Sequence, residues 1–420
     1  MTRNPMSPRR RLVAAAFATA LLVTACASDS EGSSGGGGGS DTTTPVDASV
    51  LGDKNVASGE PVKIGFVYDG TTEAIDNAGD LDAAEAAVGY VNDYLGGIAG
   101  RPIELEVCST DQTPAGAGNC VSQFAQAEVA AVLNGTTGQA GSLFEPLDEA
   151  GIPVFVSAAD PRDATATIMT NGILSLAAGP AKVFADAGVE NATIIGIDVP
   201  AASAALKQSA PLFYGEAGVD VDVVLIPPDT PDMTPNVQAA LTSDPGGMTV
   251  VGDSLFCTKA MNAIAAAGYD GLLVVIPQCF DQSFLDNVTN LEGAIMLTTS
   301  TTDPDSEEYQ LYRAAMTTYG GDDIDLGATA PQAYQAVVGF ARAMEGLDGD
   351  VTPASVEKAL LEMPPTPMPL ADGLTFQCDR KQVSIAPNIC SLDVLQTTLD
   401  ADGKAGEFTV LSGAEVLDLG

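Results

Sequence analysis

The chain has 420 residues, of which 45% are apolar and 17% charged, with 56 acidic side chains, 17 basic ones and no histidine. This length suits two or three folded domains, and the composition is that of a globular protein. Without histidine, neither a Ser-His-Asp or Cys-His catalytic group nor a histidine-ligated metal site can be built. The net charge of −39 argues against nucleic acid and anionic lipid as partners, because like charges repel.

The first 25 residues predict an export signal. Arg3 and Arg9–Arg11 supply positive charge, and the apolar run 12–25 that follows is shorter than the roughly 20 residues of a transmembrane helix. The run ends in Val23-Thr24-Ala25-Cys26. This resembles the bacterial lipobox, in which the cysteine is lipidated and becomes the new N-terminus. The alternative is an ordinary secretory signal with a chance cysteine.

Residues 26–59 are predicted to form a lipid anchor followed by a flexible linker. Residues 28–44 are rich in glycine and serine and offer no large apolar side chain for a core. A lipid on Cys26 would hold the folded body at the extracytoplasmic face of a bacterial plasma membrane. No later apolar segment is long enough for a transmembrane helix.

From residue 62 onward, predicted strands and helices alternate. The first strand is Val62–Tyr68, and a helix follows at 79–95, where apolar residues recur on one helical face. Further strands are predicted at 103–107, 129–133 and 152–156, with helices at 121–128 and 142–150. A second series has strands at 193–197, 219–226, 248–251 and 272–276, with helices at 201–214, 235–242, 258–267 and 282–288.

After residue 300, helices are predicted at 306–319, 328–347 and 353–362, and short strands near 374–376, 392–396 and 408–411. Strands that are separated by helices imply parallel sheets with helices on both faces. The sequence therefore predicts an α/β fold with two doubly wound parallel-sheet lobes that join near residues 176–182 and enclose a cleft.

The cysteines other than Cys26 are even in number, which argues for disulfides in an exported chain. They are Cys108, Cys120, Cys257, Cys279, Cys378 and Cys390. Their spacing favours pairing of near neighbours, 108 with 120, 257 with 279 and 378 with 390. The alternative is a four-cysteine metal site, although the paired ligand spacing typical of such sites is missing.

Small and polar residues follow several of the predicted strands. In open parallel sheets, ligands bind at the carboxyl ends of the strands, beside helix N-termini. The segments concerned are Asp69–Glu73, Gly135–Gly138, Ala158–Asp160, Asp253–Phe256 and Gln278–Asp281. Each alone also fits ordinary turn and cap chemistry. Together they predict ligand contacts from Asp69, Thr71, Thr136, Thr137, Ala158, Ala159, Asp160, Ser254, Phe256, Gln278 and Phe280.

The order of several segments resembles the periplasmic Leu/Ile/Val-binding protein family, the type I solute-binding proteins of ABC importers. The resemblance runs over about residues 60–412. It is carried by Lys63-Ile64-Gly65, 83–92, 96–103, the Cys108–Cys120 segment, Gly135-Thr136-Thr137, 151–159 and Gly373–Phe376. The Cys108–Cys120 segment also resembles a disulfide loop of amino-acid-binding members.

The resemblance implies two lobes that close on a ligand and are joined by three crossings of the chain. Residues 60–176 and 300–360 would form the N-terminal lobe, and residues 177–299 and 361–420 the C-terminal lobe. It also implies an ABC permease and its ATPase as partners, with no cofactor and no catalytic residue.

The ligand follows less directly from the resemblance. In amino-acid-binding members, a serine and a threonine from two N-lobe loops bind the ligand's carboxylate, and an acid from the second lobe binds its ammonium. Thr136 or Thr137 can supply one hydroxyl, but Asp160 stands at the second position and would repel a carboxylate. The second-lobe acid position falls near Gln278 or Cys279. A branched-chain amino acid, an amide, an amine or another partly apolar solute therefore fits, and Arg162 offers either a ligand contact or a surface ion pair.

Phe256 and Phe280 flank Cys257 and Cys279. A disulfide there would join two neighbouring loops and hold both rings against a ligand, which lowers the ordering cost of binding. The alternative is that both rings pack beneath the loops.

The sequence thus predicts a solute-binding lipoprotein that delivers its ligand to an importer. One alternative is a receptor of the same fold that signals to a membrane regulator. Another is an extracellular enzyme with paired acids, of which Asp160 with Asp253 or Asp281 is the pairing to inspect.

Overall fold

A computed structural model describes residues 47–71, 78–159, 163–170, 174–280, 282–321, 324–327, 329–383 and 386–413. Cys26, Asp160, Arg162 and Asp281 lie outside the described residues, as do residues 1–25 and the glycine-rich part of the linker. Within the described part of the chain, no helix is both long enough and apolar enough to span a membrane.

The first sheet is parallel throughout and has the strand order β2-β1-β3-β4-β5. Its strands are β1 (Val62–Tyr68), β2 (Ile103–Ser109), β3 (Val132–Asn134), β4 (Val154–Val156) and β5 (Ala166–Ile168). Nearly every residue of β1, β3 and β4 is buried, as expected for strands covered by helices on both faces.

The second sheet has the order β14-β13-β10-β9-β8-β6-β7. Its parallel strands are β6 (Asn191–Ile197), β7 (Asp220–Ile226), β8 (Gly247–Val251), β9 (Leu272–Val275) and β10 (Ile295–Thr298). The strands β13 (Val394–Thr398) and β14 (Thr409–Leu411) add antiparallel pairs at one edge. A small separate sheet pairs β11 (Thr366–Pro367) with β12 (Thr375–Phe376).

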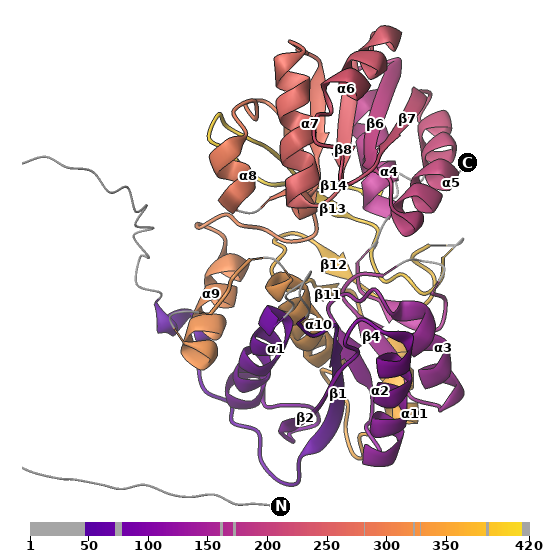
Figure 1. Ribbon diagram of the computed structural model, residues 1–420. Helices are drawn as coiled ribbons and strands as arrows, with labels where there is room; N and C mark the ends of the chain where they lie inside the picture. Colours follow the sequence, from indigo (N-terminus) through magenta and orange to yellow (C-terminus); the bar gives the residue numbers. More distant parts are fainter. Residues whose placement is uncertain are drawn as a thin grey trace, which may run out of the picture. The chain divides into compact units, whose positions relative to one another are not determined.

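The helices form two groups around these sheets (Figure 1). With the first sheet lie α1 (Ala78–Tyr90), α2 (Pro114–Ala127), α3 (Ala140–Glu149), α9 (Glu307–Gly320), α10 (Ala330–Ala343) and α11 (Pro353–Glu362). With the second sheet lie α4 (Leu174–Asp186), α5 (Pro200–Glu216), α6 (Thr234–Ala240), α7 (Ser254–Ala266) and α8 (Gln282–Asn287). Short helical turns are η1 (Ala48–Leu51), η2 (Val91–Leu95), η3 (Leu241–Ser243) and η4 (Pro277–Cys279). The predicted α/β fold with helix-covered parallel sheets is confirmed.

Several helices begin at a capping residue rather than at the first apolar residue of their stripe. Thr113 accepts a hydrogen bond from Gly116 N and is followed by Pro114, so α2 starts seven residues before the predicted helix at 121. Asp253 accepts a hydrogen bond from Phe256 N at 2.8 Å and starts α7 four residues earlier than predicted. Side-chain capping therefore determines the residue at which these helices begin.

Hydrophobic cores fill the space between each sheet and its helices. One core lies between the first sheet and α1, α9 and α10, and another lies beneath α2 and α3. The second sheet has its own core, which includes Phe184, Tyr214 and Phe284. The chain leaves the first group after β5, returns after β10, and passes to the second sheet again after Cys390.

The tail divides between the two groups differently from the predicted boundary at residue 361. Met363, Phe376 and Cys378 are buried in a core of the first sheet. Ile168 N donates to Asn388 O at 2.9 Å, and Cys390 N donates to Ile168 O at 2.8 Å, which extends the edge of β5. Residues 363–383 and 386–390 therefore pack with the first sheet, whereas β13 and β14 join the second.

The six cysteines form the predicted near-neighbour disulfides. These are Cys108–Cys120, Cys257–Cys279 and Cys378–Cys390. Since every one of these cysteines is paired, the four-cysteine metal site is excluded.

Candidate functional site

The carboxyl ends of β1, β2 and β3 meet at one edge of the first sheet, where a buried carboxylate joins the loops that follow them. Asp69 is 6% exposed. Its Oδ1 accepts hydrogen bonds from Thr110 Oγ1 at 2.8 Å and Thr137 Oγ1 at 2.7 Å, and its Oδ2 accepts one from Gly138 N at 2.8 Å. Hydrogen bonds to an ionised acceptor are among the stronger ones in proteins. Asp69 therefore fixes three loops relative to one another.

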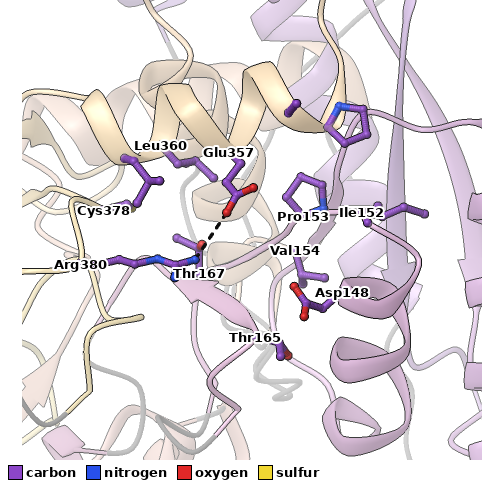
Figure 2. Close-up of a pocket in the computed structure, with 14 residues that line it drawn as sticks. Asp148, Ile152, Pro153, Val154, Thr165, Thr167, Glu357, Leu360, Cys378 and Arg380 are labelled. Atoms are coloured by element: carbon purple, nitrogen blue, oxygen red, sulfur yellow. Dashed lines mark ion pairs between the residues drawn. The ribbon is translucent and has the colours of Figure 1, made fainter.

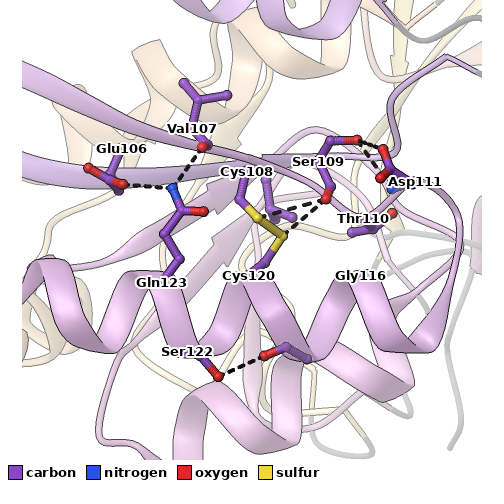
Figure 3. The surroundings of a disulfide bond; sticks show 12 residues. Glu106, Val107, Cys108, Ser109, Thr110, Asp111, Gly116, Cys120, Ser122 and Gln123 are labelled. Carbon is purple, nitrogen blue, oxygen red and sulfur yellow. Dashed lines mark hydrogen bonds between the residues drawn. A yellow bond between two sulfur atoms is a disulfide. The ribbon is translucent and has the colours of Figure 1, made fainter.

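The Cys108–Cys120 disulfide holds the middle of these loops (Figure 3). Cys108 lies in β2 and Cys120 in α2, so the bond anchors both ends of the turn that carries Thr110. Within the turn, Ser109 Oγ donates to Asp111 Oδ1 at 2.6 Å. Gly70 turns the neighbouring chain with φ +73°, where a Cβ would collide with Ser109. The position of Thr110 beneath Asp69 is thus set by covalent and backbone constraints.

The loop after β3 contains the two threonines that the sequence predicted as ligand contacts. The Thr137 hydroxyl donates to Asp69 and accepts from Gln139 N at 3.0 Å, so it serves the loop itself. Thr136 is half-buried, and its carbonyl rather than its hydroxyl takes part in the loop's bonding, accepting from Asn134 Nδ2 at 3.1 Å. Among the described residues only the Thr137 hydroxyl bonds within the loop, so the Thr136 hydroxyl is the better candidate for a ligand contact.

The loop after β4 carries small side chains at the same edge. Ala158 and Ala159 are half-buried, and Ala158 N donates to Gly135 O at 3.1 Å, which places this loop beside the Thr136 loop. Gly135 permits the approach of the α10 N-terminus, since a Cβ there would lie 2.8 Å from Ala333 N. Thr71, predicted from the β1 loop, is exposed. The structure thus brings Asp69, Thr136, Thr137, Ala158 and Ala159 together.

Asp80 is a buried acid at this edge that sequence reasoning missed. It lies in the first turn of α1 and is 1% exposed, and neither of its carboxyl oxygens has a hydrogen-bond partner among the described residues. Burial raises the pKa of Asp80 to about 6, and the nearby charge of Asp69 adds to the rise. The Thr329 hydroxyl opposes the shift, although its geometry falls short of a full hydrogen bond. The sequence carried no signal for it, since acids are common in the first turn of a helix.

The second sheet presents the loops after β8 and β9. Ser254 is half-buried at the start of α7, and its carbonyl accepts from Thr258 Oγ1 at 2.8 Å. Beside it, Leu255 is 65% exposed. The Cys257–Cys279 disulfide joins α7 to η4, so it links the two loops as predicted. Gln278 lies in η4, but its side chain is outside the described part of the structure.

The two phenylalanines beside this disulfide occupy different environments. Phe256, predicted as a ligand contact, is 1% exposed and belongs to the core of the second sheet. Its position fits the packing alternative, because a ring with so little exposed surface offers a ligand no contact. Phe280 is only partly buried and packs against Phe284 with ring centroids 4.9 Å apart. Phe280, together with Leu255, leaves apolar surface near the end of these strands.

A separate pocket of about 340 Å³ lies at the opposite, amino-terminal end of β4 (Figure 2). It is bounded by Asp148, Val154, Thr167, Glu357, Leu360 and Arg380, among others. Arg380 Nη2 lies 3.8 Å from Glu357 Oε1, and both side chains are largely exposed. Exposed pairs of this kind add little stability. None of the predicted ligand contacts lines this pocket.

Comparisons with known proteins agree with this architecture. The ABC transporter substrate-binding protein from Sphaerobacter thermophilus superposes with a TM-score of 0.69 at 18% identity, over 84% of this chain and 98% of that one. The Leu-, Ile-, Val-, Thr- and Ala-binding protein from Brucella ovis, in its closed conformation, gives 0.71 at 15% identity over 86% and 97%. An ABC transporter solute-binding protein from R. palustris in complex with 4-hydroxybenzoate gives 0.66 at 16% identity over 86% and 99%.

A search of curated protein sequences found no significant match. A sequence profile described as periplasmic binding protein matches residues 61–385, which span the first sheet, most of the second and the returning helices. The predicted resemblance is therefore confirmed, and the chain belongs to the periplasmic binding protein family.

Proposed function

We propose that this chain is an extracytoplasmic solute-binding lipoprotein that captures a small organic solute between two closing lobes and delivers it to an ABC import permease. The observation that carries the proposal is the edge of the first sheet where Asp69 joins the loops of Thr110, Thr137 and Gly138. Buried acids usually serve either structure or chemistry. Here the acid is hydrogen-bonded to its own loops, which suits a preformed binding surface and requires no catalytic step.

The solute that fits best is a branched-chain amino acid, an amide or another small, partly apolar compound. The half-buried Thr136 and the small side chains of Ala158 and Ala159 offer a polar but uncharged surface on the first lobe. The exposed Leu255 and partly exposed Phe280 offer apolar contact from the second. Binding sites for small molecules commonly combine a few polar groups with apolar walls.

The membrane attachment is proposed from the sequence. A lipid on Cys26 and the glycine-rich segment that follows would keep the receptor close to the permease and ATPase that it serves. Mass spectrometry of the protein extracted from bacterial membranes tests this part, since the N-terminal peptide should begin at a diacylated Cys26. An unmodified N-terminus at another residue would contradict the anchor.

Thermal unfolding of the mature chain against a panel of solutes tests the binding function. The panel contains leucine-like amino acids, amides, amines, 4-hydroxybenzoate, sugars and short peptides. A ligand at a hundred times its dissociation constant stabilises the folded state by about 2.7 kcal/mol, which raises the unfolding temperature by several degrees. We expect such a shift with an amino acid, an amide or a small aromatic acid. A shift with sugars alone, or with no member of the panel, would contradict the proposed solute class.

A further inference from the structure

Gln335 is a buried amide in α10 whose hydrogen bonds reach three separate segments. It is 1% exposed. Its Oε1 accepts a hydrogen bond from Ser157 Oγ at 3.0 Å, and its Nε2 donates to Thr299 O at 2.8 Å and to Pro369 O at 3.0 Å. Both amide protons and the amide oxygen are thus engaged, as a buried glutamine requires.

The first of these partners connects Gln335 to the ligand edge. Ser157 is fully buried and directly precedes Ala158 and Ala159. The Ser157 carbonyl accepts from Thr170 N at 3.1 Å and from Thr170 Oγ1 at 2.9 Å. Thr170 lies just beyond β5, where the chain leaves the first sheet for α4. Ser157 therefore contacts both the ligand loop and the first crossing between the sheets.

The second partner lies on another crossing. Thr299 follows β10, where the chain returns from the second sheet toward α9. Two residues later, Thr301 N donates to Leu370 O at 2.8 Å, so the returning chain also lies against the segment that contains Pro369. Gln335 thus contacts one crossing directly and another through Ser157.

The third partner is itself held firmly by the first group of helices. Glu308 Oε2 accepts from Leu370 N at 3.0 Å, and Glu308 Oε1 lies 2.8 Å from Arg342 Nη2. Arg342 also donates to Pro367 O at 3.2 Å. Because α9 and α10 brace residues 367–370, the Pro369 carbonyl gives Gln335 a fixed reference point on the first lobe. A change at Ser157 or Thr299 would then act on a side chain whose other hydrogen bond is to this braced segment.

We propose that Gln335 is a positioning residue that couples the ligand loop at Ser157–Ala159 to the chain crossings at Thr170 and Thr299. The inference deepens the proposed function and rests on it. Ligand binding shifts a conformational equilibrium only through contacts that differ between the two states. Gln335 is placed to supply such contacts, since its amide joins the loop proposed to meet the ligand to the crossings that would bend when the lobes close.

Two variants separate this role from simple stabilisation. Gln335→Met keeps the side-chain length but removes all three hydrogen bonds, whereas Ser157→Ala removes only the link to the ligand loop. The matched control is Gln123→Met in α2, where the amide donates to Glu106 Oε1 at 2.6 Å and Val107 O at 3.0 Å and contacts no crossing. Each protein is compared in unfolding temperature, in affinity, and in the distance between dyes on unnatural residues at the exposed positions Glu362 and Gln208.

We expect both test variants to broaden the interlobe distance distribution of the free protein. We also expect them to weaken binding of L-leucine or 4-hydroxybenzoate, whichever stabilises the unmodified chain, by about tenfold, which corresponds to one hydrogen bond of about 1.4 kcal/mol. The double variant should bind no more weakly than Gln335→Met, because that change already removes the Ser157 contact. Gln123→Met should lower the unfolding temperature without either effect.

Two results would overturn the proposal. One is that Gln335→Met and Ser157→Ala lose stability like the control while the interlobe distance distribution of the free protein stays unchanged. The other is a double variant whose loss of binding free energy equals the sum of the losses of the two single variants. Failure of both probes to bind the unmodified chain would instead count against the proposed solute class, and the free-protein distances would still decide the role of Gln335. If Gln335→Met does not fold, Ser157→Ala decides it alone.

Discussion

Asp80 shows how a single buried acid makes the stability of this protein depend on pH. Its pKa of about 6 lies above the value of 3.8 for a free side chain, because burial penalises the charged form. The folded state therefore holds the proton more tightly than the unfolded state. The stabilising contribution is complete below about pH 4 and is lost as the pH rises through about 6.

Replacing Asp80 with asparagine should remove this dependence. At pH 7.5 we expect Asp80→Asn to unfold at a higher urea concentration than the unmodified chain, with a free energy of unfolding larger by up to about 3 kcal/mol. At about pH 3.5 the two free energies should be similar. Asp82→Asn, an exposed change on the same helix, is the control and should show no such divergence. A constant difference between the Asp80 variant and the unmodified chain at every pH would contradict this account.

Asp69 is the second acid whose role can be isolated. In Asp69→Asn an NH2 group, which can only donate, replaces one carboxylate oxygen. This NH2 group must either face the N–H of Gly138 or take the place of the oxygen that accepts from Thr110 and Thr137. Hydrogen bonds to a charged group contribute about 1.5–3 kcal/mol each, so we expect a loss of about 2–3 kcal/mol in urea unfolding. The exposed Asp111→Asn, in the neighbouring turn, should cost far less. Equal costs for the two variants would show that Asp69 does not hold the loops together.

At the scale of elements, we expect the Cys257–Cys279 and Cys378–Cys390 disulfides to stabilise the fold about equally but to differ in their effect on ligand binding. Removing Cys257–Cys279 or Cys378–Cys390 should each cost about 3 kcal/mol, from the loop entropy that each bond removes in the unfolded chain. Only the first joins two loops at the edge of the second sheet. Paired Cys→Ala variants at 257 and 279 should therefore also weaken ligand binding. If removing Cys257–Cys279 leaves the same ligand affinity as removing Cys378–Cys390, the first disulfide does not preorder the binding loops.

The sequence predicted the elements whose signals are local and missed those that depend on distant partners. The apolar run of β1 was sufficient on its own, and the predicted helix at 79–95 is formed by α1 and η2, although its apolar residues do not keep to one face. By contrast, β5 (Ala166–Ile168) and β10 (Ile295–Thr298) were missed. β5 is a short strand that is defined by its pairing with β4 and by a bridge to Ile389. At the first sheet, the strand ends identified loops that the structure brings side by side. Periodicity could not show that Phe256 points into the core or that Asp69 binds its own loops.

The whole molecule is a family member recognisable from the order of its segments rather than from any one motif. Solved structures of 15–18% identity share its fold over more than four-fifths of the chain. Among these structures, the R. palustris protein binds 4-hydroxybenzoate and the Brucella ovis protein is named for binding amino acids, so the same fold accompanies different solutes. We therefore expect loop residues such as Thr136 and Leu255, rather than the sheets, to determine which ligand this chain binds.

Closure on a solute is the central claim, and small-angle X-ray scattering tests it most directly. The mature chain would be measured alone and with the panel solute that most raises its unfolding temperature. We expect that solute to reduce the radius of gyration, because a ligand held by both lobes favours the closed form. An unchanged radius of gyration with a solute that clearly stabilises the fold would contradict capture between closing lobes.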